Sequence, residues 1–277
     1  MTTGLVSNCW QKQLDSGADL LDLITQAVRT GCSCVELRQT CLGRFERDEP
    51  PVPDASALRE LPEAFPDVVF NVAINVPFLQ AENVETTPVF AAAVDAAQAV
   101  AGDHRPHLRL VDLTTSAEQL ANGQMDEVSR NVVRLTKLMI ERDGWLSIEH
   151  SLQPWQPFLG VFRDARRLLG ERADNLRLCF DPVNLLFGDT DLDPGDVTRS
   201  LSAHEISMVH FKQRRNGEVL TRMDDGDVDW REQISLLKSA GYRGPYLFEI
   251  RSTDDVWTEL ATSGEYLQTC GFTAESC

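Results

Sequence analysis

Four short apolar runs in the second half of the chain each end in a side chain that can bind a metal ion. These terminal residues are Glu149, Asp181, His210 and Glu249. Three carboxylates and one imidazole form a ligand set that suits a divalent ion. A single acidic residue after a strand is usually a surface carboxylate or a helix cap, but four on successive apolar runs are poorly explained in that way. We therefore predict a metal site made by these four residues.

The spacing of the four residues indicates how the chain brings them together. They are separated by 32, 29 and 39 positions, and each gap is about the length of one strand, one helix and the next strand. Parallel strands of a barrel all end on the same face, and neighbouring strands lie about 4.8 Å apart. Glu and His side chains can span the distance that remains. The spacing therefore predicts that the four side chains meet over one opening of a barrel.

The first half of the chain continues the same pattern. Four earlier β-rich apolar runs occur at 5–6, 34–37, 68–72 and 108–111, and segments with helical spacing occur at 20–28, 88–101, 128–138, 158–169 and 230–240. Gly31 stands where a glycine commonly ends a helix. Alternation of strand and helix predicts a parallel sheet, and eight repeats in this length favour a closed barrel. We predict an α/β fold, a single (β/α)8 TIM barrel that occupies residues 1–277 as one domain.

Composition excludes several classes of protein. The net charge of -17, with scattered Lys and Arg, argues against nucleic acid as a partner. We find no apolar run of 18 residues and no basic, apolar leader, so we expect no membrane association and a cytoplasmic location. Seven cysteines are an odd number, and reduced thiols are expected.

The residues around the four ligands resemble the xylose-isomerase-like TIM barrels, the sugar isomerase/epimerase superfamily with its inosose-dehydratase-like members. The likeness rests on Ile148-Glu149, Phe180-Asp181-Pro182-Val183-Asn184, Val209-His210-Phe211-Lys212 and, most specifically, the stretch 229–250 that ends in Phe248-Glu249-Ile250. The resemblance implies one divalent metal ion held by Glu149, Asp181, His210 and Glu249. Manganese is the metal we favour, and magnesium, cobalt and zinc remain open.

The resemblance also implies a reaction. Glu149 and Glu249 are expected to flank a substrate carbon that loses and regains a proton next to a carbonyl. A metal ion stabilises the enediolate that forms, and a glutamate beside it acts as the base. We therefore expect an isomerase or epimerase of a small sugar or keto-sugar. The alternative is a lyase of the same barrel that dehydrates an inosose or dehydroshikimate, or eliminates from a 3-keto-glycoside.

Five further residues are assigned to the site. Lys212 matches a lysine of several family members and is expected to act on a substrate oxygen or as acid or base, with a structural ion pair as the alternative. Glu36, at the end of the second strand, and Asn184 are expected to bind substrate. Epimerases of the family carry a histidine at the position of Asn184, and an amide cannot transfer a proton. Arg215 could hold a distal hydroxyl or phosphate, and Trp10 could pack against a sugar.

For two residues the sequence does not decide between a structural role and a functional one. Arg109 could point into the barrel toward an acidic group or form a stabilising ion pair. His150, next to Glu149, should point away from the barrel interior.

Two other functions remain as alternatives. A DNA-repair endonuclease on this fold would need a cluster of three zinc ions and more than the five histidines present. A barrel that only binds ligands would carry no metal. Such barrels commonly form homo-oligomers, although no stretch of this sequence marks an interface.

Overall fold

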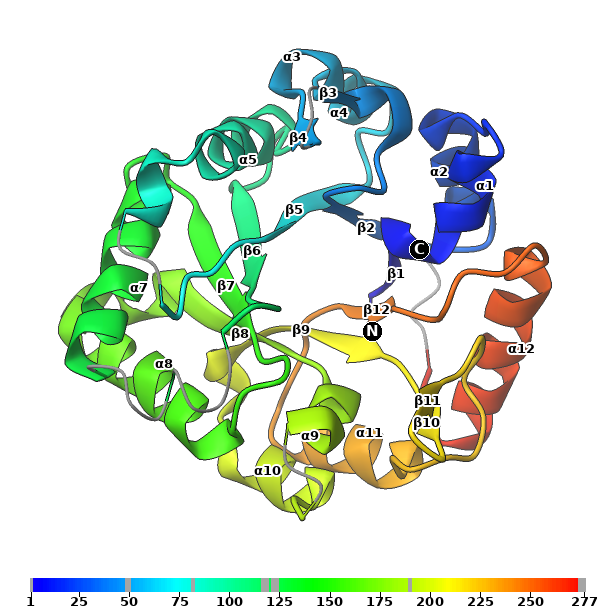
Figure 1. Cartoon of the computed structure of the whole chain (residues 1–277). Coiled ribbons are helices and arrows are strands. Elements are labelled where there is room, and N and C mark those ends of the chain that lie inside the picture. The colour runs from blue at the N-terminus through cyan, green and yellow to red at the C-terminus, as the bar shows by residue number, and fades with distance from the viewer. Residues whose placement is uncertain are drawn as a thin grey trace.

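Eight parallel strands close into a barrel with helices around it (Figure 1). The structure is a computed structural model that describes residues 2–47, 51–80, 83–115, 120, 125–188 and 191–273. Around the barrel the strands are β1 (Thr3–Val6), β2 (Cys34–Arg38), β5 (Val69–Asn75), β6 (His107–Val111), β7 (Trp145–Glu149), β8 (Leu176–Phe180), β9 (Ile206–Phe211) and β12 (Tyr246–Phe248). Each of the eight runs expected from the sequence is one of these strands, and the prediction of a TIM barrel is confirmed.

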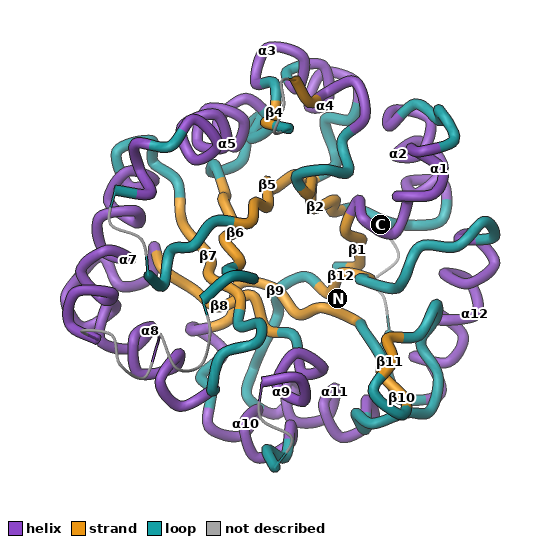
Figure 2. Tube along the Cα trace, in the orientation of Figure 1, coloured by secondary structure: helices purple, strands orange, loops and turns teal. Residues whose placement is uncertain are grey.

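The helices form the outer ring, which Figure 2 shows in purple around the orange strands. The α-helices are α1 (Gln11–Asp15), α2 (Leu20–Arg29), α3 (Ala55–Leu58), α4 (Glu60–Ala64), α5 (Pro88–Ala99), α7 (Met125–Ile140), α8 (Trp155–Leu169), α9 (Pro182–Gly188), α10 (Pro194–Ser200), α11 (Trp230–Ser239) and α12 (Val256–Thr269). Two short hairpins lie outside the barrel, β3 (Glu46–Arg47) with β4 (Val52–Pro53) and β10 (Arg214–Arg215) with β11 (Glu218–Val219). Among the described residues, no helix is long and apolar enough to cross a membrane.

Local sequence explains where the helices begin and end. Asp19 precedes α2 and accepts a hydrogen bond from the backbone N of Leu21 at 2.8 Å, and Gly31 follows that helix with a φ of 92°. Asp229 caps α11 in the same way by accepting from the backbone N of Glu232 at 3.0 Å. Side-chain caps and a glycine in the left-handed region satisfy backbone groups that a helix end leaves unpaired. The acidic stretch before Trp230 is therefore a loop with a helix cap.

Side chains of the strands alternate between the outside and the inside of the barrel, and this alternation separates two apolar regions. Outward side chains of the strands pack with the helices in one large cluster. Inside the barrel a small cluster consists of Val6, Cys34, Cys179, Met208 and Leu247. Successive side chains of a strand point to opposite faces, so every second residue enters the interior. The barrel interior therefore contains this small apolar cluster together with the inward polar side chains of the same strands.

Gly4 allows β1 and β2 to approach each other closely. It pairs with Cys34, and a Cβ atom at Gly4 would collide with the carbonyl oxygen of Cys34. Because backbone cannot move aside as a side chain can, we expect Gly4→Ala to lower the free energy of unfolding by about 3 kcal/mol. Urea denaturation measures the change. Gly264→Ala is the control, since no heavy atom lies within 4 Å of the added methyl in α12; there we expect a gain of up to about 1 kcal/mol.

His107 is a neutral histidine inside the barrel. Its Nε2 lies 2.7 Å from Ser147 Oγ, and its ring stacks on Trp145 with centroids 4.1 Å apart. Burial lowers the pKa of His107 to about 3. Because the folded pKa lies below the unfolded value, the unfolded chain binds a proton first as the pH falls. The stability linked to His107 is therefore complete above pH 6.5 and is lost as the pH falls toward 3.

We expect the stability difference between the parent and His107→Gln to depend on pH. Protonation of His107 in the unfolded chain should lower the free energy of unfolding of the parent by about 2 kcal/mol between pH 7.5 and pH 5. The variant has no histidine at this position, so it cannot show this change. Urea denaturation at the two pH values measures both proteins. His104→Gln, in an exposed loop, is the control for loss of a histidine. A difference that stays constant over this range would contradict the assignment.

Candidate metal centre

The four predicted ligands meet at the carboxyl end of the barrel. Glu149 is the last residue of β7, Asp181 and Glu249 directly follow β8 and β12, and His210 is the penultimate residue of β9. All four are buried, and one potential ligand atom from each lies within 4.8 Å of the other three. Strand ends of a parallel barrel share one face, so the topology itself brings these positions together.

The ring of His210 faces two different groups. Its Nδ1 lies 3.4 Å from Glu149 Oε1 and 3.3 Å from Glu249 Oε2. Its Nε2 lies 3.5 Å from Glu36 Oε1, on the other edge of the ring. Histidines that bind metals commonly direct the second ring nitrogen to a carboxylate, which fixes the tautomer. In this arrangement Nδ1 faces the other ligands and Glu36 is placed to orient the ring.

Asp181 has two roles, one for each oxygen. Its Oδ1 accepts hydrogen bonds from the backbone N of Val183 at 2.8 Å and of Asn184 at 3.3 Å, so it caps the start of α9. Its Oδ2 faces Lys212 at a distance of 3.0 Å from Nζ. The helix cap fixes the carboxylate, and the second oxygen remains directed into the site.

Lys212 crosses the site from the end of β9. Besides Asp181, its Nζ contacts Glu249 Oε2 at 2.9 Å and Asn184 Oδ1 at 3.1 Å. Its backbone oxygen accepts a hydrogen bond of 2.9 Å from Trp230 Nε1, which holds the strand end against α11. Burial alone would lower the pKa of Lys212, but the charges of Asp181 and Glu249 hold it above its usual value. The side chain is therefore an ammonium group.

Arg109 lies fully buried between two acidic side chains. Its guanidinium forms ion pairs with Glu36 and with Glu149 Oε2. Asn71 Nδ2 also donates to Glu36, at 2.7 Å. Burial alone would raise the pKa of Glu36, but Arg109 and His210 hold it below its usual range. Both sequence interpretations of Arg109 are thus correct, since it points into the barrel toward acidic groups and forms a buried ion pair.

The charges of the site leave room for a divalent cation. Four buried carboxylates belong to Glu36, Glu149, Asp181 and Glu249, whereas Arg109 and Lys212 supply two largely buried positive charges. Buried charges are unfavourable unless they are paired. Burial alone would lower the pKa of His210, but Cys179, Glu249 and Glu149 raise the pKa well above its usual value. The convergence of several buried carboxylates and the set of oxygen and nitrogen donors fit a divalent metal ion.

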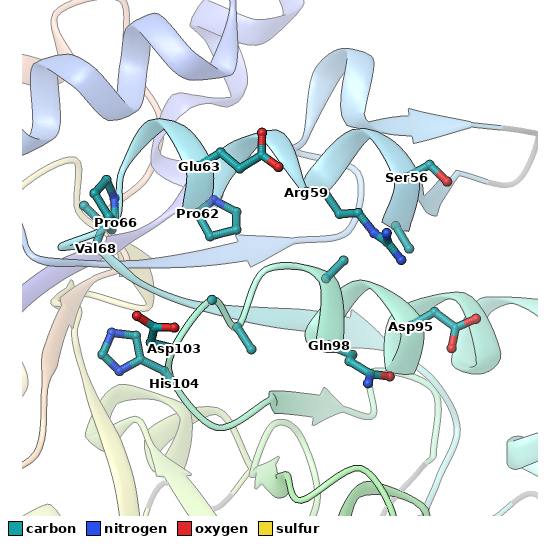
Figure 3. A pocket seen from close by; sticks show the side chains of 14 residues that line it. Ser56, Arg59, Pro62, Glu63, Pro66, Val68, Asp95, Gln98, Asp103 and His104 are labelled. Carbon is teal, nitrogen blue, oxygen red and sulfur yellow. The ribbon is translucent and has the colours of Figure 1, made fainter.

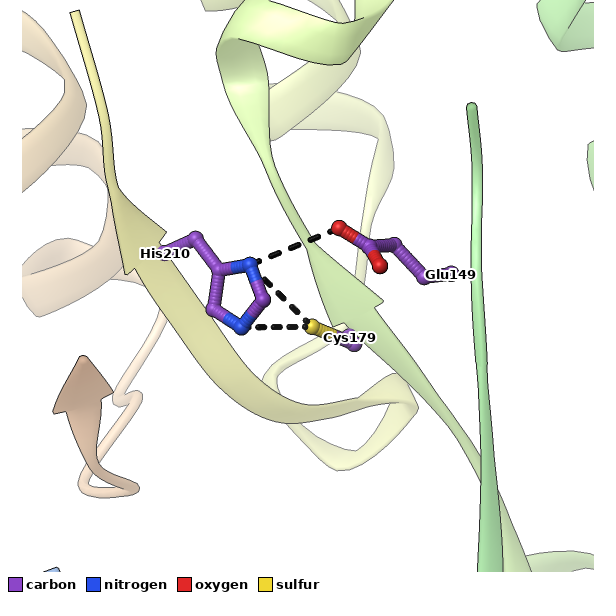
Figure 4. Close-up of side chains that lie close together, drawn as sticks. All are labelled: Glu149, Cys179 and His210. Carbon is purple, nitrogen blue, oxygen red and sulfur yellow. Dashed lines mark hydrogen bonds and ion pairs between the residues drawn. The ribbon is translucent and has the colours of Figure 1, made fainter. Parts of the chain in front are cut away.

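Cys179 is a functional candidate that sequence reasoning missed. It lies two residues before Asp181 and thus on the same face of β8, and this period of two is the signal that could have found it. Its Sγ lies 3.3 Å from Nε2 and 3.8 Å from Nδ1 of His210. Figure 4 shows Glu149, Cys179 and His210 converging, and these three form a second group of ligand atoms. Burial raises the pKa of the Cys179 thiol to about 12.

The other predicted site residues divide into two groups. Glu36 and Asn184 lie at the site: Asn184 Nδ2 donates to Glu149 Oε1 at 3.1 Å, and Glu36 contacts His210 as described. Trp10 is fully buried and packs against Trp257 with centroids 6.0 Å apart. Arg215 is half-exposed and pairs with Asp224 at 3.6 Å. Among the contacts between described residues, the structure does not bring Trp10 or Arg215 to the four ligands.

His150 points away from the barrel interior, as expected. Its Nε2 lies 2.6 Å from the backbone oxygen of Gln153, and its ring lies edge-on to Trp155 and Phe158 of α8. The ring therefore belongs to the layer between strand and helix.

A groove on the outside of the barrel is separate from this site. It has a volume of about 710 Å³ and lies between α3 and α4 on one side and α5 with the following loop on the other (Figure 3). Its lining includes the exposed side chains of Arg59, Glu63, Asp95, Asp103 and His104. None of its lining residues is one of the four ligands, so we do not assign it to the same chemistry.

Sequence comparison agrees with the barrel fold. The profile of the "Xylose isomerase-like TIM barrel" family matches residues 24–270. The chain belongs to this family. The match includes all four strand-end ligands and most of the barrel. A search of curated protein sequences finds no match.

Solved structures of the same fold show how far the likeness extends. An L-ribulose 3-epimerase is 14% identical, with a TM-score of 0.68 over 98% of this chain and 94% of that one. An IolI protein "with a binding zinc atom" is 14% identical, with a TM-score of 0.67 over 98% and 95%. A probable 3-DHS dehydratase, AsbF of Bacillus anthracis, is 14% identical, with a TM-score of 0.71 over 97% and 99%. At this identity the likeness establishes the fold.

Proposed function

We propose that this protein is a divalent-metal-dependent isomerase or epimerase of a small sugar or keto-sugar. The observation that carries the proposal is the convergence of Glu149, Asp181, His210 and Glu249 at the ends of four strands. The solved structures of similar fold include an L-ribulose 3-epimerase and a D-tagatose 3-epimerase-like protein, which supports sugars as the substrate class. Three oxygens and one nitrogen suit manganese best, with magnesium, cobalt and zinc as alternatives.

The four ligands would hold the ion, and the remaining side chains would act on the substrate. When bound, a divalent ion supplies Lewis acidity that makes a proton next to a carbonyl easier to remove. Glu249 is the base in this proposal. Burial alone would raise its pKa, but Lys212 and His210 hold the pKa well below the usual value, so Glu249 is ionised at neutral pH. Glu149, which contacts Arg109 and Asn184, would act on the second side of the same carbon.

Lys212 and Asn184 would position substrate oxygens between the two glutamates. The ammonium of Lys212 donates hydrogen bonds to Asp181, Glu249 and Asn184, and a substrate hydroxyl or carbonyl oxygen can replace one of these acceptors. The amide of Asn184 can donate to or accept from a hydroxyl. Homo-oligomer formation remains part of the expectation for such a barrel.

A lyase of the same barrel is the second candidate. The specific observation that favours it is the pairing of Asn184 with Lys212 at 3.1 Å. An ammonium can donate a proton to a departing hydroxyl, whereas the amide cannot return a proton to carbon. The similar fold of a probable 3-DHS dehydratase supports the same class.

The first test is metal content together with deuterium incorporation. We expect about one divalent ion per chain in the parent and its loss in a Glu149→Gln, Glu249→Gln double variant, because two of the four ligands lose their charge. A panel of keto-sugars in deuterated water should then give an isomeric product with deuterium at one carbon. An enone absorbance with loss of water would select the lyase. A parent that stays metal-free after dialysis against manganese would contradict both enzymes.

A further inference from the structure

Two overlapping groups of ligand atoms share the same glutamate and histidine. The outer group consists of Glu149, Asp181, His210 and Glu249, and we call it the outer position. The second group consists of Glu149, Cys179 and His210, and we call it the inner position. Cys179 is fully enclosed in the barrel beside Val6, Cys34 and Met208. The two positions differ in chemistry, because the first offers oxygen and nitrogen alone and the second adds sulfur.

The spacing of the inner atoms fits one bound ion. Zinc binds sulfur at about 2.3 Å and nitrogen at about 2.0–2.1 Å, so two such ligands at a tetrahedral angle lie roughly 3.3–3.7 Å apart. Cys179 Sγ lies 3.8 Å from His210 Nδ1, and the same Nδ1 lies 3.4 Å from Glu149 Oε1. Figure 4 shows the three side chains directed at one another from three neighbouring strands. The three donor atoms lie within 4.8 Å of one another, so one ion can bind all three once the thiolate moves closer to Nδ1.

Lys212 makes the two positions unequal. Its ammonium contacts both carboxylates that belong only to the outer position, Asp181 at 3.0 Å and Glu249 at 2.9 Å. An ion in the outer position has to displace this ammonium from them. An ion in the inner position does not, because the hydrogen bonds of Lys212 within the described part of the chain go to Asp181, Asn184 and Glu249 and not to Cys179 or His210. Arg109 pairs with Glu149 Oε2 and leaves Oε1 directed at His210.

We propose that the inner position, Glu149–Cys179–His210, is a second metal position that selects zinc-class ions, whereas the outer position takes manganese or magnesium. Thiolates favour zinc and carboxylates favour magnesium and manganese. Cys179 binds as a thiolate, and the S–H proton passes to bulk water as the ion enters. The inference rests on the proposed function in one respect, which is that the two metal positions share Glu149 and His210. Because they share these ligands, zinc in the inner position excludes the outer ion, and zinc bound there would inhibit the proposed enzyme.

Cobalt is the probe that reports sulfur ligation directly. We expect the parent loaded with about one Co²⁺ per chain to show a thiolate-to-cobalt charge-transfer band in the near ultraviolet. Cys179→Ser should lose this band, and an Asp181→Asn, Glu249→Gln double variant should keep it. Cys34→Ser is the matched control, since Cys34 is buried in the same interior cluster and is in neither ligand group; it should keep the band. Thermal denaturation of each variant confirms that it is folded.

The outcomes separate this inference from the proposed function. A parent that binds Co²⁺ without the band, or a Cys179→Ser variant that keeps it, overturns the inner position. Manganese binding, followed by electron paramagnetic resonance, should remain at about one ion per chain in Cys179→Ser, because the outer position is intact. A parent with the cobalt band and no manganese binding would support the inner position and contradict the proposed enzyme. A parent that binds manganese but shows no cobalt band would support the metal site of the proposed enzyme and contradict the inner position.

Discussion

An Arg109→Leu variant should be less stable than the parent by about 3–5 kcal/mol. Arg109 is 1% exposed and pairs with Glu36 and Glu149, which are equally enclosed. Removing one partner of a buried pair leaves the other charge without compensation, and this is the larger part of the loss. Here one arginine pairs with two carboxylates, so its removal takes the guanidinium partner from both. Urea denaturation of the metal-free protein measures the change.

Two comparisons make the result specific to the buried pair. A Glu36→Leu, Arg109→Leu double variant should recover part of the lost stability, because it removes one of the two uncompensated carboxylates. Arg142→Leu is the surface control, since Arg142 pairs with Asp95 at 3.1 Å while both side chains are exposed. We expect Arg142→Leu to lower the free energy of unfolding by less than about 1 kcal/mol. An Arg109→Leu variant that behaves like Arg142→Leu would show that the interior charges are already solvated.

A Lys212→Met variant should bind a divalent ion more tightly and turn over substrate far more slowly. The ammonium contacts Asp181 and Glu249, so it competes with the ion for the same oxygens. Its removal therefore raises manganese affinity. The loss of a positioned proton donor should lower kcat by about 10²–10⁴-fold. Calorimetry with manganese and steady-state kinetics on the substrate found in the deuterium screen measure the two effects.

The test is that manganese affinity rises while kcat falls in Lys212→Met. A lysine with a purely structural role would lower metal affinity and activity together when it is lost, because the ligands would lose their order. Lys137→Met, on the exposed face of α7, is the matched control and should change neither quantity. A rate that stays within a few-fold of the parent would remove Lys212 from the chemistry.

The sequence predicted the barrel and the convergence of the four candidate ligands, because both follow from strand alternation. Apolar runs predicted each strand, and a residue at the end of a parallel strand has only one face of the barrel to occupy. The same period places Glu36 and Arg109 inside. The period of two does not predict the position of each side chain along the barrel axis, because that position depends on the stagger between neighbouring strands. The contacts between Arg109, Glu36 and Glu149 therefore required the structure.

Residues beyond the strand ends were the hardest to place. Trp10 follows β1 in a short 3-10 helix, Ser7–Trp10, and its ring turns into the core. Arg215 enters a hairpin, where its backbone pairs with Glu218. Loop conformation is set by contacts far away in the sequence, so a motif cannot indicate which way such side chains turn. Cys179 was missed for a different reason, since a cysteine within an apolar run reads as part of the core.

The enclosed thiols offer a way to time how the barrel opens. Cys9 donates to the backbone oxygen of Phe248 at 3.2 Å, beside the seam where β1 pairs with β12 through three residues of each strand. Cys179 lies on β8, on another part of the wall. A thiol reacts with an alkylating reagent only after it is exposed, so each labelling rate reports the opening of its own neighbourhood. Labelling of Cys9 ahead of Cys179 would show that the joint between the first and last strands opens before the wall around β8.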